Sequence, residues 1–278
     1  MYRRTASLAA ALAFFTAAAI PAVAEGRLEA QYSIALTGIP IGRSALVLEL
    51  TNDNYSTAGS ASVTGLLKLV APGKGSAASR GSITNGKVSP ISYSLTSESG
   101  ERWEDIRMAI AASVVRDFTI MPPPSHPDDR VPVTDEHRKG VIDPMSAMIM
   151  PVPGAGDLLS AEACNRTISI FDGRQRYDLV MNYERSDSAK NIKGYSGPLI
   201  VCRIAYRPLA GHRPNRVQVK YMIENKNIFV WLAPVAGTRV LLPARFTIAT
   251  MLGTLVVQAT HFSSEQRAQA AGSPAVKK

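Results

Sequence analysis

Apolar and polar residues alternate along much of this sequence, and this period of two limits the possible folds more than any other feature. It is clearest in three runs: EAQYSIAL at 29–36, ISYSLTS at 91–97 and VQVKYMIE at 217–224. Successive side chains of a β-strand point to opposite faces, whereas the apolar positions of an amphipathic helix recur about every 3.6 residues. The alternation therefore predicts half-buried antiparallel strands in all three runs.

Turn-forming residues separate such runs at intervals of roughly 8 to 12 residues, which is the spacing of short strands in all-β domains. Examples are Gly38 to Pro40, Asn85-Gly86, Asp172-Gly173 and Asn225 to Asn227. We predict one all-β domain over residues 25–263: a strongly curved antiparallel sheet, half-barrel or spiral-like, of about a dozen strands with one short helix. The small and polar segment 264–278 is predicted to be a disordered tail.

The segment VIDPMSAMIMP at 141–151 departs from the alternation. Asp143 suits an N-cap, Pro144 the first helical position and Pro151 a stop, so a helix of two turns is predicted over residues 143–150. Met145 and Met148 would lie on its apolar face, over the mouth of the curved sheet or inside its concavity. Core packing and contact with a bound lipid both remain open for them, because methionine adapts to varied partners.

The first 24 residues have the pattern of a secretory signal peptide: Arg3 and Arg4, an apolar run of ~14 residues, and the cleavage triplet Ala22-Val23-Ala24. This run is shorter than the roughly 20 apolar residues that a membrane-spanning helix needs, and no later segment is long enough either. We therefore expect export, signal-peptide removal before Glu25, and no transmembrane segment in the mature chain.

The charge of the mature chain is mildly basic. Without residues 1–24 it keeps 29 of the 31 Lys and Arg residues and all 22 Asp and Glu residues, a net charge of +7. Such an excess favours loose attraction to anionic surfaces such as lipid headgroups, but it lacks the clustered stripe of a nucleic-acid-binding protein. No nucleic-acid partner is expected.

Two cysteines remain in the mature chain, Cys164 and Cys202. An even number of cysteines in an oxidising compartment favours a disulfide over a metal site or a redox pair. A reactive thiol is the less favoured alternative, because it needs an activating neighbour and no histidine is adjacent in sequence. We predict a Cys164–Cys202 disulfide.

The stretch SIFDGRQRYDLVM at 169–181 concentrates charge, as a catalytic cluster or an ordinary turn would. Because Asp172-Gly173 is a preferred two-residue hairpin turn, the structural interpretation places the charges around it, opposite the tyrosines, solvated or paired across strands. The alternative is an anion-binding patch shared with the basic stretch at 202–216. The candidate ligand-binding residues are Arg174, Arg176, Arg203, Arg207, His212 and Arg213, with Met145 and Met148 for an apolar ligand.

Familiar catalytic and metal-binding motifs are absent from the sequence. The four histidines show no H-x-H or H-E-x-x-H spacing, and there is no G-x-S-x-G motif. The composition of residues 122–140 is typical of a mobile surface loop. That loop contains the residues considered for a metal: His126, Asp128, Asp129, Asp135 and His137. We expect no catalytic residue, no metal and no cofactor.

Five fragments, in this order and spacing, resemble one known family: GIPIG at 38–42, DPMSAMIMP at 143–151, FDGRQRYDL at 171–179, GYSGP at 194–198 and CRIAYRPLAGHR at 202–213. The family is the uncharacterised group of exported bacterial proteins catalogued as domain of unknown function 3108. The resemblance covers roughly residues 27–262 and implies a periplasmic protein without an established activity. It supplies no catalytic residues.

These observations favour a non-enzymatic cell-envelope protein. Its curved sheet would bind a lipid or another apolar or anionic envelope ligand, with basic residues near the rim meeting anionic headgroups. Two alternatives remain open. One is a scaffold that binds another envelope protein, and the other is a hydrolase of envelope glycans or esters that uses His212 or a carboxylate of residues 126–137.

Overall fold

The computed structural model describes residues 26–51, 53–65, 67–124 and 127–266. Residues 1–25 and 267–278, and so the expected signal peptide and most of the expected tail, lie outside the described residues. Seven strands form the first half of the fold: β1 Gly26–Leu36, β2 Ile39–Thr51, β3 Asn54–Val63, β4 Gly73–Thr84, β5 Lys87–Ser99, β6 Arg102–Ala111 and β7 Val114–Met121.

The second half contains the remaining strands: β8 Met150–Pro151, β9 Arg166–Phe171, β10 Arg176–Ser188, β11 Pro198–Ala210, β12 Ile228–Pro234, β13 Val240–Thr250 and β14 Gly253–Gln266. All pair antiparallel in a single 14-stranded sheet of order β7-β6-β5-β4-β3-β2-β1-β14-β13-β12-β11-β10-β9, with β8 beside β13. Each half is thus a meander, and β1 joins β14 to connect the two. The predicted all-β curved sheet is confirmed, with 14 strands instead of about a dozen.

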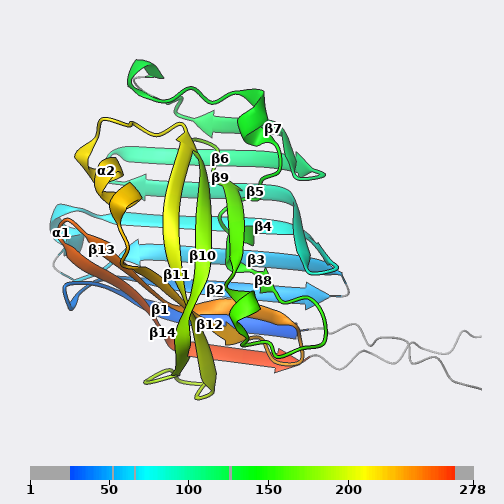
Figure 1. Cartoon of the computed structure of the whole chain (residues 1–278). Coiled ribbons are helices and arrows are strands. Elements are labelled where there is room, and N and C mark those ends of the chain that lie inside the picture. The colour runs from blue at the N-terminus through cyan, green and yellow to red at the C-terminus, as the bar shows by residue number, and fades with distance from the viewer. Residues whose placement is uncertain (1–25, 52, 66, 125–126, 267–278) are drawn as a thin grey trace, which may run out of the picture.

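The sheet curls so strongly that β9, β10 and β11 cross in front of β4, β5 and β6 (Figure 1). Its two edge strands, β7 and β9, do not pair with each other. Residues 139–142 lie between them instead. Val141 donates its backbone N–H to Ser113 O next to β7, and Ile142 donates to Ser169 O of β9. One short segment therefore hydrogen-bonds to both edges of an open sheet.

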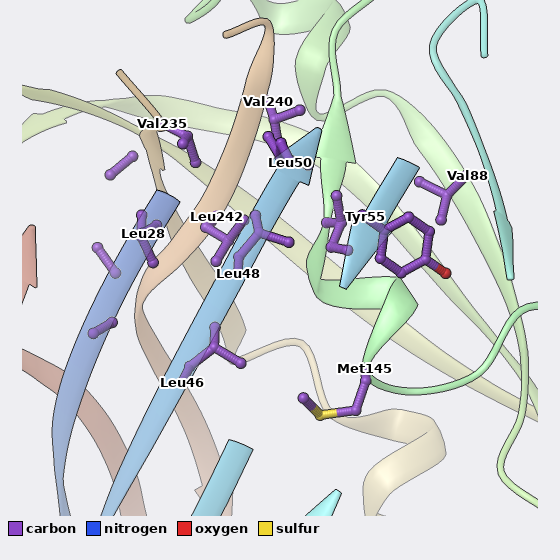
Figure 2. Packing of buried hydrophobic residues seen from close by; sticks show 14 of the residues in the cluster. Leu28, Leu46, Leu48, Leu50, Tyr55, Val88, Met145, Val235, Val240 and Leu242 are labelled. Atoms are coloured by element: carbon purple, nitrogen blue, oxygen red, sulfur yellow. The ribbon is translucent and has the colours of Figure 1, made fainter. Parts of the chain in front are cut away.

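The main hydrophobic core fills the concave side of the curl. Leu46, Leu48 and Leu50 occupy alternate positions of β2 and point toward Val240 and Leu242 of β13 (Figure 2). The alternation that predicted the strands is therefore the alternation that fills this core.

A second core cluster lies on the opposite face of the later strands. On β11, Leu199 and Val201 belong to the first cluster, whereas Ile200, Cys202 and Ile204 belong to the second. The strand is therefore buried on both faces.

The described residues form two α-helices, α1 Leu67–Val70 and α2 Val217–Glu224, where one helix was expected. The prediction of a strand over residues 217–224 is wrong. Lys220 donates its backbone N–H to Arg216 O, as in a helical turn, and β12 rather than this segment pairs with β11. None of the eight helical residues is buried, and Val217 is 61% exposed. An alternating pattern misleads here because the segment packs against the second core cluster only through the half-buried Met222 and has no face buried along its length.

The predicted two-turn helix over residues 143–150 is also wrong, although the segment is placed as expected. Only Ser146–Met148 forms a helical turn, of the 3-10 type. Met150 already pairs with Leu241 of β13, so the chain has become extended two residues later. The segment lies inside the curl, where Met145 reaches toward Leu46 (Figure 2).

The hairpin between β9 and β10 has a loop of four residues, Asp172 to Gln175, not the predicted two-residue turn. Phe171 pairs with Arg176 across it, and Asp172 Oδ1 accepts the backbone N–H groups of Arg174 and Gln175. The aspartate side chain thus closes a wider turn than a two-residue loop allows. At the other end of the fold, β14 continues to Gln266 because it pairs with Gly26, so the strand passes residue 263.

Cys164 and Cys202 form the predicted disulfide, with an S–S distance of 1.98 Å. Both are fully buried in the second core cluster, where the bond ties the segment before β9 to β11. In the part of the chain that the structure describes, no helix is both long enough and apolar enough to cross a bilayer.

Candidate functional site

A cavity of about 300 Å³ lies between the concave face of β2–β5 and the methionine segment, residues 143–150, which carries Met145 and Met148. Its wall on the sheet side is built from small residues. On β3 and β4 the inward positions are Gly59, Ala61, Gly75 and Ala77. Leu46, Leu95, Phe246, Val257 and the two methionines supply the larger apolar surfaces. Among the described residues that line the cavity, none is charged.

The cavity exists because the inward residues of β3 and β4 are too small to fill the curl. At Gly59 the fit is close, since an added Cβ would lie 3.3 Å from Met145 Cε. Glycine weakens a strand interior and often marks a close approach. Here it allows the methionine side chain to lie against the sheet.

The inward row of β3 becomes more accessible between Tyr55 and Ala61. Tyr55 and Thr57 are buried, Gly59 is half-buried and Ala61 is exposed. The neighbouring row on β5 changes in the same direction, from buried Tyr93 through half-buried Leu95 and Ser97. The cavity therefore has a closed end near Tyr55 and an open end near α1.

A buried polar network closes the deep end. Asp143 is fully buried, and its Oδ1 accepts the backbone N–H groups of Met145 and Ser146 at 3.0 and 2.9 Å. Its Oδ2 accepts the hydroxyl of Ser79 on β4 at 2.9 Å, and Tyr55 on β3 shares a hydrogen bond with Ser146. The network fixes the methionine segment to two strands of the first meander.

Burial sets the ionisation of this network. It raises the pKa of Asp143, because a carboxylate loses hydration in an apolar interior, while the hydrogen bonds from Ser146, Ser79 and Met145 partly oppose the rise. Burial also raises the pKa of Tyr55 to about 12, so its hydroxyl remains protonated. Each of these polar groups has a partner, as an anchor requires.

Of the residues predicted to bind a ligand, the structure brings only Met145 and Met148 to this cavity. The sequence interpretation missed the small residues opposite them. Their signal was present in STAGSAS at 56–62 and GKGSAAS at 73–79, where glycine, alanine and serine replace the usual large strand residues. An alternation of small residues predicts a strand that leaves space beside it.

Four of the basic candidates are engaged by carboxylates in four different places. Arg174 pairs with Glu104 of β6, and Arg176 Nη1 lies 2.7 Å from Asp178 Oδ1 on the same strand. Arg203 pairs with Glu184 at 2.7 Å and Arg213 with Asp129 at 2.9 Å. Arg207 lies opposite Asp178 in the β10–β11 register. The charges of the 169–181 stretch thus join structural elements around a turn.

His212 lies against the loop before the methionine segment. Val131 donates its backbone N–H to His212 O, and Arg130 Nη1 donates to Gly211 O. The imidazole is nearly buried, which lowers the pKa of His212. The nearby Asp129 carboxylate pairs with Arg213 rather than with the imidazole.

Within the described ranges, no group of three or more His, Cys, Asp and Glu side chains is placed to hold a metal ion. His126, one of the residues considered for a metal, lies outside those ranges.

The fold resembles a solved structure of another family. A β-barrel-like protein of domain of unknown function DUF1849 from Brucella abortus superimposes with a TM-score of 0.50 at 10% sequence identity, covering 87% of this chain and 98% of that one. At this identity the likeness concerns the fold alone. No curated protein matches the sequence. The profile of a family described as protein of unknown function, DUF3108, matches residues 31–260. The chain therefore belongs to the DUF3108 family.

Proposed function

We propose that this protein is an exported, non-enzymatic cell-envelope protein that binds the acyl chain of a lipid or a similar amphiphile between β2–β5 and the methionine segment. The observation that carries the proposal is the uncharged, apolar cavity of about 300 Å³ that opens toward α1. Small-molecule sites are typically apolar concavities of about 300–1,000 Å³. This cavity is at the lower end, which suits one chain better than a lipid with several.

The lining suits a flexible apolar ligand. The small side chains of β3 and β4 leave a smooth floor, and the unbranched side chains of Met145 and Met148 adapt their shape to what lies beside them. The anchoring network at Asp143 holds the backbone of the segment in place beneath the cavity. An acyl chain would lie along the inward row with its polar end at the open end.

Two features support export. The pattern of residues 1–24 is that of a signal peptide, and a disulfide between Cys164 and Cys202 forms and persists in an oxidising compartment. Periplasmic location and lipid binding are tested separately below.

The test of binding compares two alanines on opposite faces of β3. Ala61 faces the cavity, whereas Ala58 is exposed on the outer face. Phenylalanine at Ala61 should fill the open end, so Ala61→Phe should weaken binding of N-phenyl-1-naphthylamine, followed by fluorescence and competed with dodecanoate, by at least ~10-fold. Ala58→Phe should bind as the parent does. Equal affinities in the two variants, or no saturable binding by the parent, would contradict the proposal.

Location is tested by fractionation. The parent should appear in the periplasmic fraction as a shortened chain beginning at Glu25, detected by intact mass. A full-length chain retained in the cytoplasm would contradict export.

A hydrolase is the second candidate, and one observation favours it. The structure brings His212 against residues 129–131, so a histidine and a carboxylate of that loop lie in one region. General acid–base work needs such groups to converge on a substrate. Hydrolysis of an ester substrate that His212→Gln abolishes, without change in thermal stability, would favour this candidate over the carrier.

A further inference from the structure

Exposed apolar side chains gather at the end of the sheet where the cavity opens. They come from three places: the β1–β2 turn, helix α1 and the β13–β14 turn. The most exposed are Leu69 at 81% and Leu252 at 80%. The others are Ile39, Leu67 and Met251. Single exposed apolar residues are ordinary, but several on adjacent loop tips mark an interaction surface.

Backbone hydrogen bonds show that these tips share one end of the fold. Thr37 of the β1–β2 turn donates to Thr254 O beside the β13–β14 turn, at 2.9 Å. Thr64, just before α1, donates to Ile41 O of β2 at 3.0 Å. Figure 1 shows α1 at this end of the strands.

Basic residues flank the apolar tips. Over residues 37–43, 67–75, 97–102 and 250–254, four basic side chains accompany two acidic ones, a local excess of two positive charges. The basic residues are Arg43, Lys68, Lys74 and Arg102, and the acidic ones are Glu98 and Glu101. Glu98 is paired with Lys74 at 2.9 Å. Lys68 lies between Leu67 and Leu69 on α1, so a cation accompanies the most exposed leucine.

The open end of the cavity is continuous with this surface. Ala61 lines the cavity, and two positions along β3 the same inward row reaches Val63, close to α1. An amphiphile leaving the cavity along β3 therefore emerges among the apolar tips.

We propose that this end docks on an anionic lipid bilayer, with Leu69 and Leu252 entering the interface and the flanking cations meeting the headgroups. Protruding apolar tips with neighbouring basic residues fit a bilayer surface, where apolar burial and electrostatic attraction act together. Docking would place the cavity mouth against the membrane, so that an acyl chain passes between bilayer and protein without crossing water. This last step rests on the proposed lipid binding, whereas docking itself does not.

The test is cosedimentation of the exported protein with vesicles of phosphatidylethanolamine and phosphatidylglycerol. The parent should bind, bind less as salt rises, and bind weakly to phosphatidylcholine vesicles. The double variant Leu69→Ser/Leu252→Ser should lose at least ~10-fold in partition coefficient, and Lys68→Glu should lose at least about fivefold, which corresponds to the ~1 kcal/mol that one basic residue contributes. Ile91→Ser is the matched control, since Ile91 is 54% exposed on β5 toward the opposite end of the sheet.

The two proposals fail separately. If the double variant keeps probe binding but no longer sediments with vesicles, docking stands on these tips and the cavity is intact. If vesicle binding persists while the parent shows no saturable probe binding, lipid carriage fails and docking remains. Docking is overturned if the double variant sediments like the parent, if Ile91→Ser loses as much, or if the parent binds neither type of vesicle.

Discussion

Strands β3 and β11 are neighbours in neither sequence nor sheet order, and they show how differently the two meanders are built. In β11, Leu199, Ile200, Val201 and Cys202 are buried in succession, so both faces of the strand are covered. In β3, only Tyr55 and Thr57 of ten residues are buried. The second meander is therefore packed on both sides, whereas the first lines a space that it does not fill.

The difference teaches where stability and binding can be separated. Burial of apolar area is the main stabilising contribution to folding. In the second meander, apolar side chains are buried on both faces of the sheet. The first meander offers small side chains to a cavity and depends on the Asp143 network for its contact with the methionine segment. Changes in the second meander should therefore alter stability, and changes at the small cavity-lining positions of β3 and β4 should mainly alter binding.

The largest expected effect on stability comes from removing the disulfide of the second meander. It closes a sequence separation of 38 residues, and the chain-entropy relation gives about 4 kcal/mol for a loop of that length. Cys164→Ser/Cys202→Ser should lower the free energy of unfolding by about that amount, measured by urea denaturation. Probe binding by the fraction that remains folded should be unchanged. A decrease of less than ~1 kcal/mol in the free energy of unfolding would contradict a large contribution of this disulfide to stability.

The next largest effect is expected at one leucine of a pair, one from each meander. Leu232 on β12 is fully buried, whereas Leu95 on β5 is half-buried and lines the cavity. Leu232→Ala should cost about 2–5 kcal/mol because it leaves a void in a packed region. Leu95→Ala should cost less than half as much and enlarge the cavity. Equal losses of unfolding free energy would show that the two meanders are packed alike.

The smallest expected effect concerns Asp143, which joins the methionine segment to the first meander. Asp143→Ala removes the acceptor for Met145, Ser146 and Ser79 and should cost about 1–3 kcal/mol at neutral pH, whereas Asp143→Asn should cost less.

The pH dependence of the parent has a defined sign. Because the pKa of Asp143 is raised in the folded state, the folded protein holds this proton more tightly than the unfolded chain does. Its contribution to stability is fully present below the unfolded pKa near 3.9 and is lost as pH rises through the folded pKa. Asp143→Asn should not show this loss. Parallel pH profiles of the two proteins would contradict a raised pKa.

The sequence predicts the strands well where one face is buried and poorly where the surroundings decide. Alternation at 29–36 and 91–97 identifies parts of β1 and β5, since their inward residues enter the core. The same alternation fails at α2, where no residue is buried. The methionine segment is placed inside the curl as anticipated, but its helix is shortened by pairing with β13, a contact between residues far apart in the chain.

The site is predicted only in part for the same reason. Met145 and Met148 are visible in the sequence as an unusual apolar pair, but the cavity wall comes from residues whose importance is the volume that they lack. Four of the basic candidates are engaged by carboxylates, such as Glu104 for Arg174, although the β10–β11 register places Arg176 opposite Ala210. Periodicity reports which face a residue occupies, and it cannot report which residue lies opposite.

Pairing of β1 with β14 has a consequence for biogenesis. Gly26 pairs with Gln266, so the seam between the meanders forms only after nearly all of the described chain is available to fold. Contacts so distant in sequence form slowly, because the entropy of closing a long loop is lost before the contacts contribute any stabilising free energy. Until then, β1 exposes an unpaired edge that invites aggregation. Such a chain would depend on chaperones during folding more than a fold whose strands pair only with sequential neighbours.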